Sequence, residues 1–301
     1  MDRSPIYIPP NNFADGLSSQ REYCLFLDID GTLADFTLDP SDSVIPKATL
    51  TVLQKIQNCG IKIAIVTGRS LVEARQMLSP MVLPIAATHG LEIALDGVKH
   101  SGDGGSVYID SVAHVDLAAL TAIRHSIIQS CKPYSGLSIE TKPYSVALHY
   151  RQNPALADIA YTMMSSIIKH HADWALKQGK CVCEAVPKGV NKGTAILTLL
   201  NNIQAGDDIC PIFIGDDITD EAGFMAIQGQ NDFLKKYHKP AKGMGIKVGR
   251  EPSCAHYYVN NVAEVTVLLQ RFLSFCQLQN MRSVESDMDR LAPTKIVRHP
   301  I

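Results

Sequence analysis

Short apolar runs alternate with helical patterns along most of the chain. The runs at 24–27, 61–66 and 212–214 have the length of strands, and segments with apolar residues every three or four positions follow them. We expect helices to begin near Pro46, which suits a first helical turn, and near Ser70. Because the strand runs are almost continuously apolar, they predict a parallel sheet covered by helices on both faces.

The middle of the chain has a different pattern. Residues 117–127 and 156–167 predict two amphipathic helices. Residues 137–142 and 144–151 predict two strands between them, and 180–186 predicts a third strand after the second helix. This order of helix, two strands, helix and strand indicates an α+β unit inserted into the α/β unit.

The two ends of the chain lack these patterns. Residues 1–20 are rich in Pro, Asn and Ser and predict a flexible N-terminal arm, and the charged, non-periodic residues 280–301 predict a flexible C-terminal tail. We therefore divide the chain into a catalytic core of residues 21–110 and 187–279, an α+β cap of residues 111–186, and these two ends.

Composition narrows the class of protein. The 301 residues carry 28 Lys plus Arg and 30 Asp plus Glu, a net charge of −2, which argues against a nucleic-acid or anionic-membrane partner. No apolar run approaches the roughly 20 residues that cross a bilayer, and no signal peptide is visible, so we expect a cytoplasmic protein. We expect a monomer or small homo-oligomer. The eight cysteines, of which only Cys181 and Cys183 are close, predict reduced and mostly buried thiols.

A pair of acids follows the first apolar run. Asp28 and Asp30, with Gly31 beside them, come directly after residues 24–27. The carboxyl ends of parallel strands are where open α/β sheets bind ligands. Two acids at such a point repel each other unless a cation is near, although an isolated pair of this kind often serves as a cap or turn.

Further polar groups follow other strands in order. Thr67-Gly68-Arg69 offers a hydroxyl and backbone amides suited to a phosphate, and Lys192 precedes a helix. Gly215-Asp216-Asp217 and then Asp220 follow the run at 212–214. Taken singly, Lys192 fits a surface lysine and Thr67 a helix cap. Together, at successive strand ends, they predict a phosphate site with Mg²⁺, which prefers oxygen ligands.

This set resembles the haloacid dehalogenase (HAD) superfamily of phosphohydrolases, whose motifs occur here in order. The resemblance implies a HAD-like Rossmannoid core with a C2-type cap, in which Asp28 is the nucleophile and Asp30 the general acid and base. It implies that Mg²⁺ is held by Asp28, the backbone carbonyl of Asp30 and Asp216, with Asp217 and Asp220 orienting the metal's waters. The residues implied to bind phosphate are Thr67, Gly68, Arg69 and Lys192.

One face of the expected cap sheet is polar. Strand periodicity places Val146 and Leu148 on one side of 144–151, and His149 and Arg151 on the other. The polar side, which also carries Glu140 and Lys142 of the preceding strand, fits either a solvated surface with ordinary salt bridges or a set of groups for sugar hydroxyls.

Longer strings resemble a particular family, the trehalose-6-phosphate phosphatases. They are Glu140-Thr141-Lys142 with Ala147-Leu148-His149-Tyr150-Arg151, the segment from Glu184 to Gly193, Thr88-His89-Gly90-Leu91-Glu92, and Gly215 to Glu221. This resemblance implies hydrolysis of trehalose 6-phosphate to trehalose and phosphate through an aspartyl-phosphate. The residues implied to bind or border the substrate are Glu140, Lys142, His149, Arg151, His89, Glu92 and Glu184.

Two alternatives stay open from the sequence. One is a HAD phosphatase or phosphomutase acting on another sugar phosphate, such as sucrose 6-phosphate, because the superfamily fold hosts many substrates. The other is a catalytically silent sugar-phosphate sensor, which is disfavoured because every motif acid is present. His89 fits a structural role as well as a functional one.

Overall fold

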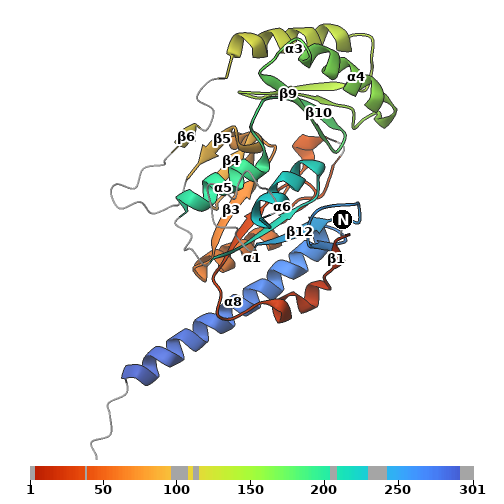
Figure 1. Cartoon of the computed structure of the whole chain (residues 1–301). Coiled ribbons are helices and arrows are strands. Elements are labelled where there is room, and N and C mark those ends of the chain that lie inside the picture. The colour runs from red at the N-terminus through yellow and green to blue at the C-terminus, as the bar shows by residue number, and fades with distance from the viewer. Residues whose placement is uncertain are drawn as a thin grey trace, which may run out of the picture.

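The computed structural model describes residues 4–37, 39–95, 108–110, 115–203, 209–229 and 243–291, with the backbone alone at 108–110 and 283–291. These residues form a nine-stranded sheet and a separate four-stranded sheet. The smaller sheet and its helices, which form the cap, lie above the larger sheet in Figure 1.

The larger sheet has the order β1-β13-β12-β11-β2-β3-β4-β5-β6. All neighbouring strands run parallel except at the β4–β5 and β5–β6 pairs, an antiparallel edge that the sequence did not indicate. The strands are β1 (Ile6–Tyr7), β2 (Tyr23–Leu27), β3 (Lys62–Val66), β4 (Ile85–Ala87), β5 (Glu92–Ala94), β6 (Tyr108–Asp110), β11 (Cys210–Gly215), β12 (Met244–Val248) and β13 (Tyr257–Val259).

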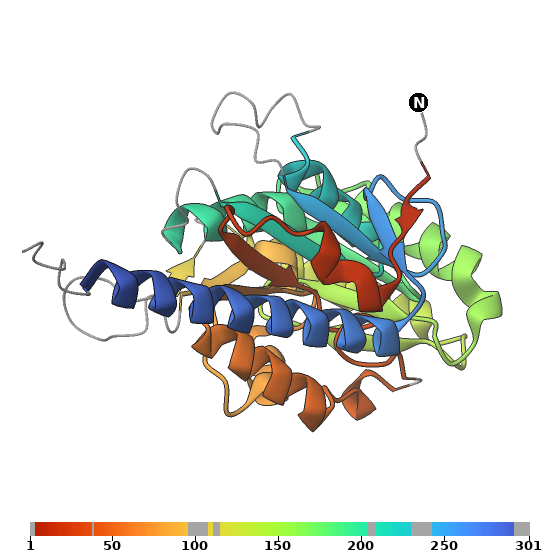
Figure 2. The same ribbon diagram turned by 90° about the horizontal axis from the view of Figure 1, so that it is seen from below.

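Helices cover both faces of this sheet, as predicted (Figure 2). Alternate side chains of β2 enter different clusters, Leu25 and Leu27 on one face and Cys24 and Phe26 on the other. The first face packs against α1 (Lys47–Asn58), α2 (Leu71–Leu78) and α8 (Val262–Leu291), and the second against α5 (Lys192–Asn202) and α6 (Glu221–Ile227). The short 3₁₀ helices are η1 (Pro10–Gly16), η2 (Pro40–Asp42), η3 (Thr88–Gly90), η4 (Pro154–Leu156) and η5 (Ile218–Asp220).

The cap is an antiparallel sheet of order β7-β8-β10-β9 with helices on one face. Val146, Leu148 and Cys183 pack against Ile123 and Met164 of the helices, which confirms the predicted apolar side of residues 144–151. The sequence missed β9, which has little alternation of apolar and polar residues. The elements are α3 (Leu117–Cys131), β7 (Ser138–Thr141), β8 (Val146–His149), α4 (Ala157–Ile168), β9 (Trp174–Gly179) and β10 (Val182–Pro187).

The N-terminal arm is structured, so the prediction of a flexible arm over residues 1–20 is wrong for residues 4–20, the part that the structure describes. β1 pairs in parallel with β13 at the edge of the sheet. In η1, Phe13 is only 3% exposed, and its ring centroid lies 6.3 Å from that of Phe272 in α8. A single buried aromatic in a proline-rich segment is too little periodicity to reveal this packing from sequence.

The predicted C-terminal tail is wrong as far as Leu291, because α8 continues through the proposed start of the tail at Asn280. The physical reason is that no glycine or proline interrupts the chain between Asn280 and Leu291. Figure 1 shows the helix extending well beyond the core. Residues 292–301 of the predicted tail lie outside the described residues.

Two further expectations concern cysteines and membranes. The eight cysteines all lie within the described residues and form no disulfide, as predicted. Across the described part of the chain, no helix combines the length and apolarity needed to span a membrane.

Candidate active site

The acids and the lysine predicted from separate motifs converge at the carboxyl edge of the larger sheet. Asp28 directly follows β2, Asp216 follows β11, and Lys192 begins α5. The Lys192 Nζ lies 3.0 Å from Asp28 Oδ2 and 2.8 Å from Asp220 Oδ1. Carboxylate oxygens of Asp28, Asp216 and Asp220 lie within 4.8 Å of one another. Asp220, predicted only to orient the metal's waters, therefore belongs to the central cluster.

Gly31 allows this close approach. Its φ of +73° lies in the left-handed region, and a Cβ at this position would stand 2.0 Å from Asp216 Oδ2. Only glycine lets the turn after β2 lie this close to the carboxylate of Asp216.

The electrostatics of this cluster fit a divalent cation. Burial raises the pKa of Asp28 well above its usual range despite Lys192. Burial, together with Asp220 and Asp217, raises the pKa of Asp216 to about 7. Burial alone would lower the pKa of Lys192, but the two nearby carboxylates raise it. A cluster of oxygen donors whose repulsion the lysines do not fully offset is suited to a hard cation such as Mg²⁺.

Lys247 is a residue of this site that the sequence reasoning missed. It lies on β12 opposite Gly215, is only 4% exposed, and its Nζ donates to the backbone carbonyl of Asp216. A lysine inside the short apolar run 246–248 was the available signal, because buried lysines need a partner.

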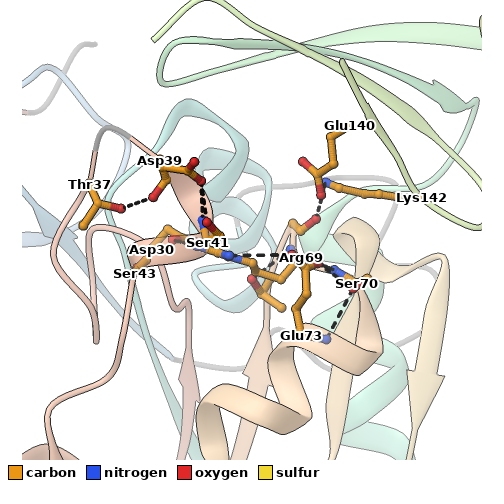
Figure 3. A network of polar contacts seen from close by, with 12 residues as sticks. Asp30, Thr37, Asp39, Ser41, Ser43, Arg69, Ser70, Glu73, Glu140 and Lys142 are labelled. Atoms are coloured by element: carbon orange, nitrogen blue, oxygen red, sulfur yellow. Dashed lines mark hydrogen bonds and ion pairs between the residues drawn. The ribbon is translucent and has the colours of Figure 1, made fainter. Parts of the chain in front are cut away.

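Arg69 is occupied by carboxylates. Its Nε and Nη2 donate to Asp30 Oδ2 at 2.7 Å and Oδ1 at 2.6 Å, and Nη1 lies 3.7 Å from Glu73 (Figure 3). Burial by itself would raise the pKa of Asp30, but the Arg69 guanidinium holds it below its ordinary value. The buried Thr67 hydroxyl accepts from the Arg69 amide at 3.1 Å. The phosphate-binding role of Arg69 therefore stays a prediction, and the structure assigns its guanidinium to Asp30.

Cap and core meet in a buried polar cluster around Glu184 on β10. Its carboxylate accepts hydrogen bonds from Lys142 Nζ at 3.1 Å and Ser145 Oγ at 2.6 Å, and lies 2.8 Å from His89 Nε2. Lys142 Nζ also donates to the Gly68 carbonyl at 2.6 Å. Cap residues thus bond directly to two core loops.

Burial and charge fix the protonation of this cluster. Burial by itself would raise the pKa of Glu184, but Lys142 and His89 lower it well below its ordinary range. Burial lowers the pKa of His89, so the imidazole is neutral at pH 7 and its Nε2–H donates to the carboxylate. The φ of +58° at His89 is unusual for a residue with a side chain, and the surrounding contacts maintain it.

A cavity of about 110 Å³ lies between core and cap, smaller than the roughly 300 Å³ of a typical ligand pocket. The arrangement of cap and core therefore leaves a narrow space between them. Among its lining residues, those that the sequence predicted are Asp28, Asp30, Gly68, Arg69, His89, Glu140, His149, Arg151, Lys192, Asp216 and Asp217, and those that it missed are Phe36, Pro40, Lys180, Val182 and Thr219.

Several predicted residues do not line the cavity. Glu92 accepts a hydrogen bond from the Thr88 hydroxyl at 3.0 Å and is buried within the core, so the structure does not bring it to the substrate space. Thr67, Lys142, Glu184 and Asp220 are also buried, each beside a residue that does line the cavity.

Comparison with known proteins identifies the family. The family model described as trehalose-phosphatase matches residues 26–263, which include the acid cluster and the whole cap. The chain belongs to the trehalose-phosphatase family. It is 29% identical over 269 residues to the trehalose-6-phosphate phosphatase of Escherichia coli, covering 89% of this chain and 93% of that one. It is 33% identical over 223 residues to a probable trehalose-phosphate phosphatase of Sinorhizobium fredii, covering 72% and 78%.

Solved structures agree with this family's fold. The C-terminal domain of a trehalose-6-phosphate phosphatase from C. albicans superposes with a TM-score of 0.74 at 20% identity, over 91% of this chain and 99% of that one. A HAD-superfamily phosphatase from Bacteroides thetaiotaomicron gives 0.53 at 15% identity, over 86% and 98%. The predicted HAD-like core with an inserted cap is confirmed.

The contribution of the Glu184 cluster to the stability of this trehalose-phosphatase family member can be tested by mutation. We expect Glu184→Gln to lower the free energy of unfolding at pH 7 by about 3 kcal/mol, because Lys142 loses its buried counter-charge. The native pKa of Glu184 is depressed, so its stabilisation is present above the unfolded value of about 4.3 and is lost as pH falls. The loss should therefore shrink below about pH 4.

Urea unfolding at pH 7 and pH 3.5 measures this effect. Trp174, the chain's single tryptophan, is buried in the cap and reports cap unfolding by fluorescence. The matched control is Glu251→Gln, at an exposed glutamate. An equal loss at both pH values would contradict the charge-pairing explanation.

Proposed function

We propose that this protein is a Mg²⁺-dependent phosphatase that hydrolyses trehalose 6-phosphate to trehalose and phosphate. The observation that carries the proposal is the buried cluster of Asp28, Lys192 and Asp216 at the sheet edge, beneath a cap face bearing Glu140 and Arg151. Family membership and the trehalose-phosphatase names of the relatives support the same substrate.

The first chemical step is displacement at phosphorus. An Asp28 oxygen attacks phosphorus, the bond to the sugar oxygen breaks, and the departing oxygen takes a proton from Asp30, which leaves an aspartyl-phosphate. We assign to Lys192 and Thr67 the hydrogen bonds to phosphoryl oxygens. A bound Mg²⁺, held by Asp28, the Asp30 carbonyl and Asp216 beside Asp220, supplies positive charge that offsets carboxylate–phosphate repulsion.

The second step reverses the role of Asp30. Its carboxylate takes a proton from water, the water oxygen attacks phosphorus, and the bond to Asp28 breaks to release phosphate. Arg69 lowers the pKa of Asp30 against the effect of burial, which keeps Asp30 deprotonated and so able to accept that proton. The preceding acid step requires a protonated Asp30, so we propose that the Arg69–Asp30 contact loosens when substrate binds.

The cap supplies sugar recognition in this proposal. We assign residues 21–110 and 187–279 to the catalytic core and 111–186 to the cap. The His149 Nε2 lies 2.8 Å from Glu140 Oε2, and contacts with His149 and Lys142 lower the pKa of Glu140 although burial alone would raise it. An ionised Glu140 offers acceptors to sugar hydroxyls, and Arg151, which also lines the cavity, offers donors.

A substrate panel tests the function. We expect phosphate release to be fastest from trehalose 6-phosphate, slower from sucrose 6-phosphate and glucose 6-phosphate, and abolished by EDTA. Excess Mg²⁺ should restore activity, and EDTA already saturated with Mg²⁺ is the matched control. Equal or faster turnover of sucrose 6-phosphate would overturn the substrate assignment, and full activity in EDTA would overturn the metal requirement.

A further inference from the structure

The cap contacts the core at a second place, separate from the Glu184 cluster. The turn 179–181 joins β9 to β10 and reaches the loop that follows β11. Its Lys180 amide donates to Asp217 Oδ2 at 3.0 Å, and the Lys180 Nζ lies 3.6 Å from Asp216 Oδ2. The tip of the cap sheet therefore rests on the loop that carries the metal-binding acid.

Phe36 forms the other half of this contact. The Arg151 guanidinium carbon lies 3.6 Å from the centroid of the Phe36 ring, and the Lys180 Nζ lies 5.0 Å from it. Arg151 also donates to the backbone carbonyl of Thr37. Two cap cations thus pack on one aromatic ring of the core, an arrangement that is favourable electrostatically.

The fit between the turn and Asp217 is close. A Cβ at Gly179 would stand 2.7 Å from Asp217 Oδ2 and 2.9 Å from Val182 Cγ1, so any larger residue must move the turn and these two side chains apart. The other Asp217 oxygen accepts from the Ile218 amide at 2.6 Å, which fixes the carboxylate in place. Asp217, predicted to orient the metal's waters, also bonds to the cap here.

Both anchors adjoin the reacting groups along the chain. Phe36 lies on the loop that begins with Asp28 and Asp30, and Asp217 follows Asp216 directly. Arg151 and Lys180 line the cavity, so the contacts that close the cap also place its cations beside the phosphate site.

We propose that Phe36 and Asp217 are positioning residues that hold the β9–β10 turn and Arg151 of the closed cap against the two catalytic loops, and that this contact sets the preference for sugar phosphates over small phosphate esters. The inference rests on the proposed phosphatase function. A sugar phosphate is bound by core and cap together, whereas a small ester needs the core alone. Weakening the contact should therefore lower turnover of the sugar phosphate more than turnover of the small ester.

Two variants weaken the contact without altering an acid of the cluster. Phe36→Leu keeps apolar bulk but removes the ring, and Gly179→Ala pushes the turn away from Asp217. For Phe36→Leu we expect kcat/KM for trehalose 6-phosphate to fall about tenfold, mainly through KM, since a lost cation–π contact in a partly desolvated site has this size. For Gly179→Ala we expect a fall of about the same size, because the Lys180 amide loses its hydrogen bond to Asp217. Turnover of p-nitrophenyl phosphate with Mg²⁺ should stay within about twofold of wild type.

Matched controls separate this effect from general damage. Gly16→Ala adds a Cβ where no atom lies within 4 Å, and Tyr161→Leu removes an exposed cap aromatic. Both should behave as wild type. Hydrogen exchange of the 179–181 turn in the wild type and the two test variants is the second readout, and exchange should be faster in Phe36→Leu.

The outcomes are distinguishable. Equal loss for both substrates, no loss for either, or a gain with trehalose 6-phosphate would overturn the proposal, the last because the contact would then oppose substrate entry. If the wild type hydrolyses p-nitrophenyl phosphate but not trehalose 6-phosphate, the proposed function fails. In that case the hydrogen-exchange comparison alone tests whether Phe36 holds the 179–181 turn against the core. Equal exchange of this turn in wild type and Phe36→Leu would reject that contact.

Discussion

Asp28→Asn is expected to reduce phosphate release by at least about 10³-fold, the scale seen when a catalytic nucleophile is removed. The amide nitrogen of asparagine carries no negative charge and cannot form the aspartyl-phosphate. Lys192 would keep its bond to Asp220, so the loss should fall on kcat rather than on folding. Single-turnover measurements with trehalose 6-phosphate should show no covalently bound phosphate in the variant.

The fold should tolerate this change. Burial raises the pKa of Asp28 well above its usual range, which means that the site disfavours the charged carboxylate, and a neutral amide of the same shape avoids that cost. We expect the melting temperature of Asp28→Asn to equal or exceed that of wild type. Asp15→Asn, at an exposed aspartate, is the control. A folded Asp28→Asn protein with near-normal activity would rule out the aspartyl nucleophile.

Lys192→Met is expected to damage both activity and stability. The lysine is 2% exposed, and its removal leaves the carboxylates of Asp28 and Asp220 buried without their nearest cation. A loss of about 3–5 kcal/mol of unfolding free energy at pH 7 follows from breaking a buried pair in this way. Loss of a donor to the phosphoryl oxygens should lower kcat by at least about 10²-fold.

The pH dependence identifies the cause of that instability. Burial already raises the pKa of Asp28 against the pull of Lys192, so the variant's Asp28 should stay protonated to still higher pH. A carboxyl group whose pKa is raised by folding binds its proton more tightly in the native state, so the variant regains stability as pH falls below that raised value. Chemical unfolding of Lys192→Met at pH 7 and pH 5 should show a smaller deficit at pH 5.

The control for this prediction lies on the same loop. Lys188→Met removes an exposed lysine and should leave stability and activity unchanged. If Lys192→Met were as stable as wild type at pH 7, the lysine could not be the main counter-charge of the cluster.

The gathering of polar residues at the strand ends was predictable from the sequence, because the geometry of a parallel sheet brings the carboxyl ends of its strands to one edge. A continuous apolar run such as 24–27 has to be buried on both faces, and parallel strands bring Asp28 and Asp216 to one edge whatever the intervening chain does. The helix starting after Ser70 was visible for the same kind of local reason, since Ser70 and Glu73 form a capping box.

The partners of individual side chains were harder to predict from the sequence, because they depend on which residues the fold brings together. The sequence around Arg69 does not show whether its guanidinium binds phosphate or donates two hydrogen bonds to Asp30. Phe36 carries no periodic signal, and its role depends on Arg151, which is distant in sequence. The strand Trp174–Gly179 was missed because pairing with β10, rather than its own alternation, keeps it extended.

The ordered beginning of the chain has a practical consequence for work on this protein. The family match starts at residue 26, so trimming the gene to the matched region would delete β1, η1 and the first three residues of β2. The hydrogen bonds from the Ile6 and Ile8 amides to His256 and Tyr258 would be lost, leaving β13 as a bare sheet margin, and Phe272 would lose the cover of Phe13. We expect such a shortened protein to aggregate during purification, because exposed edge strands of different molecules can pair with one another.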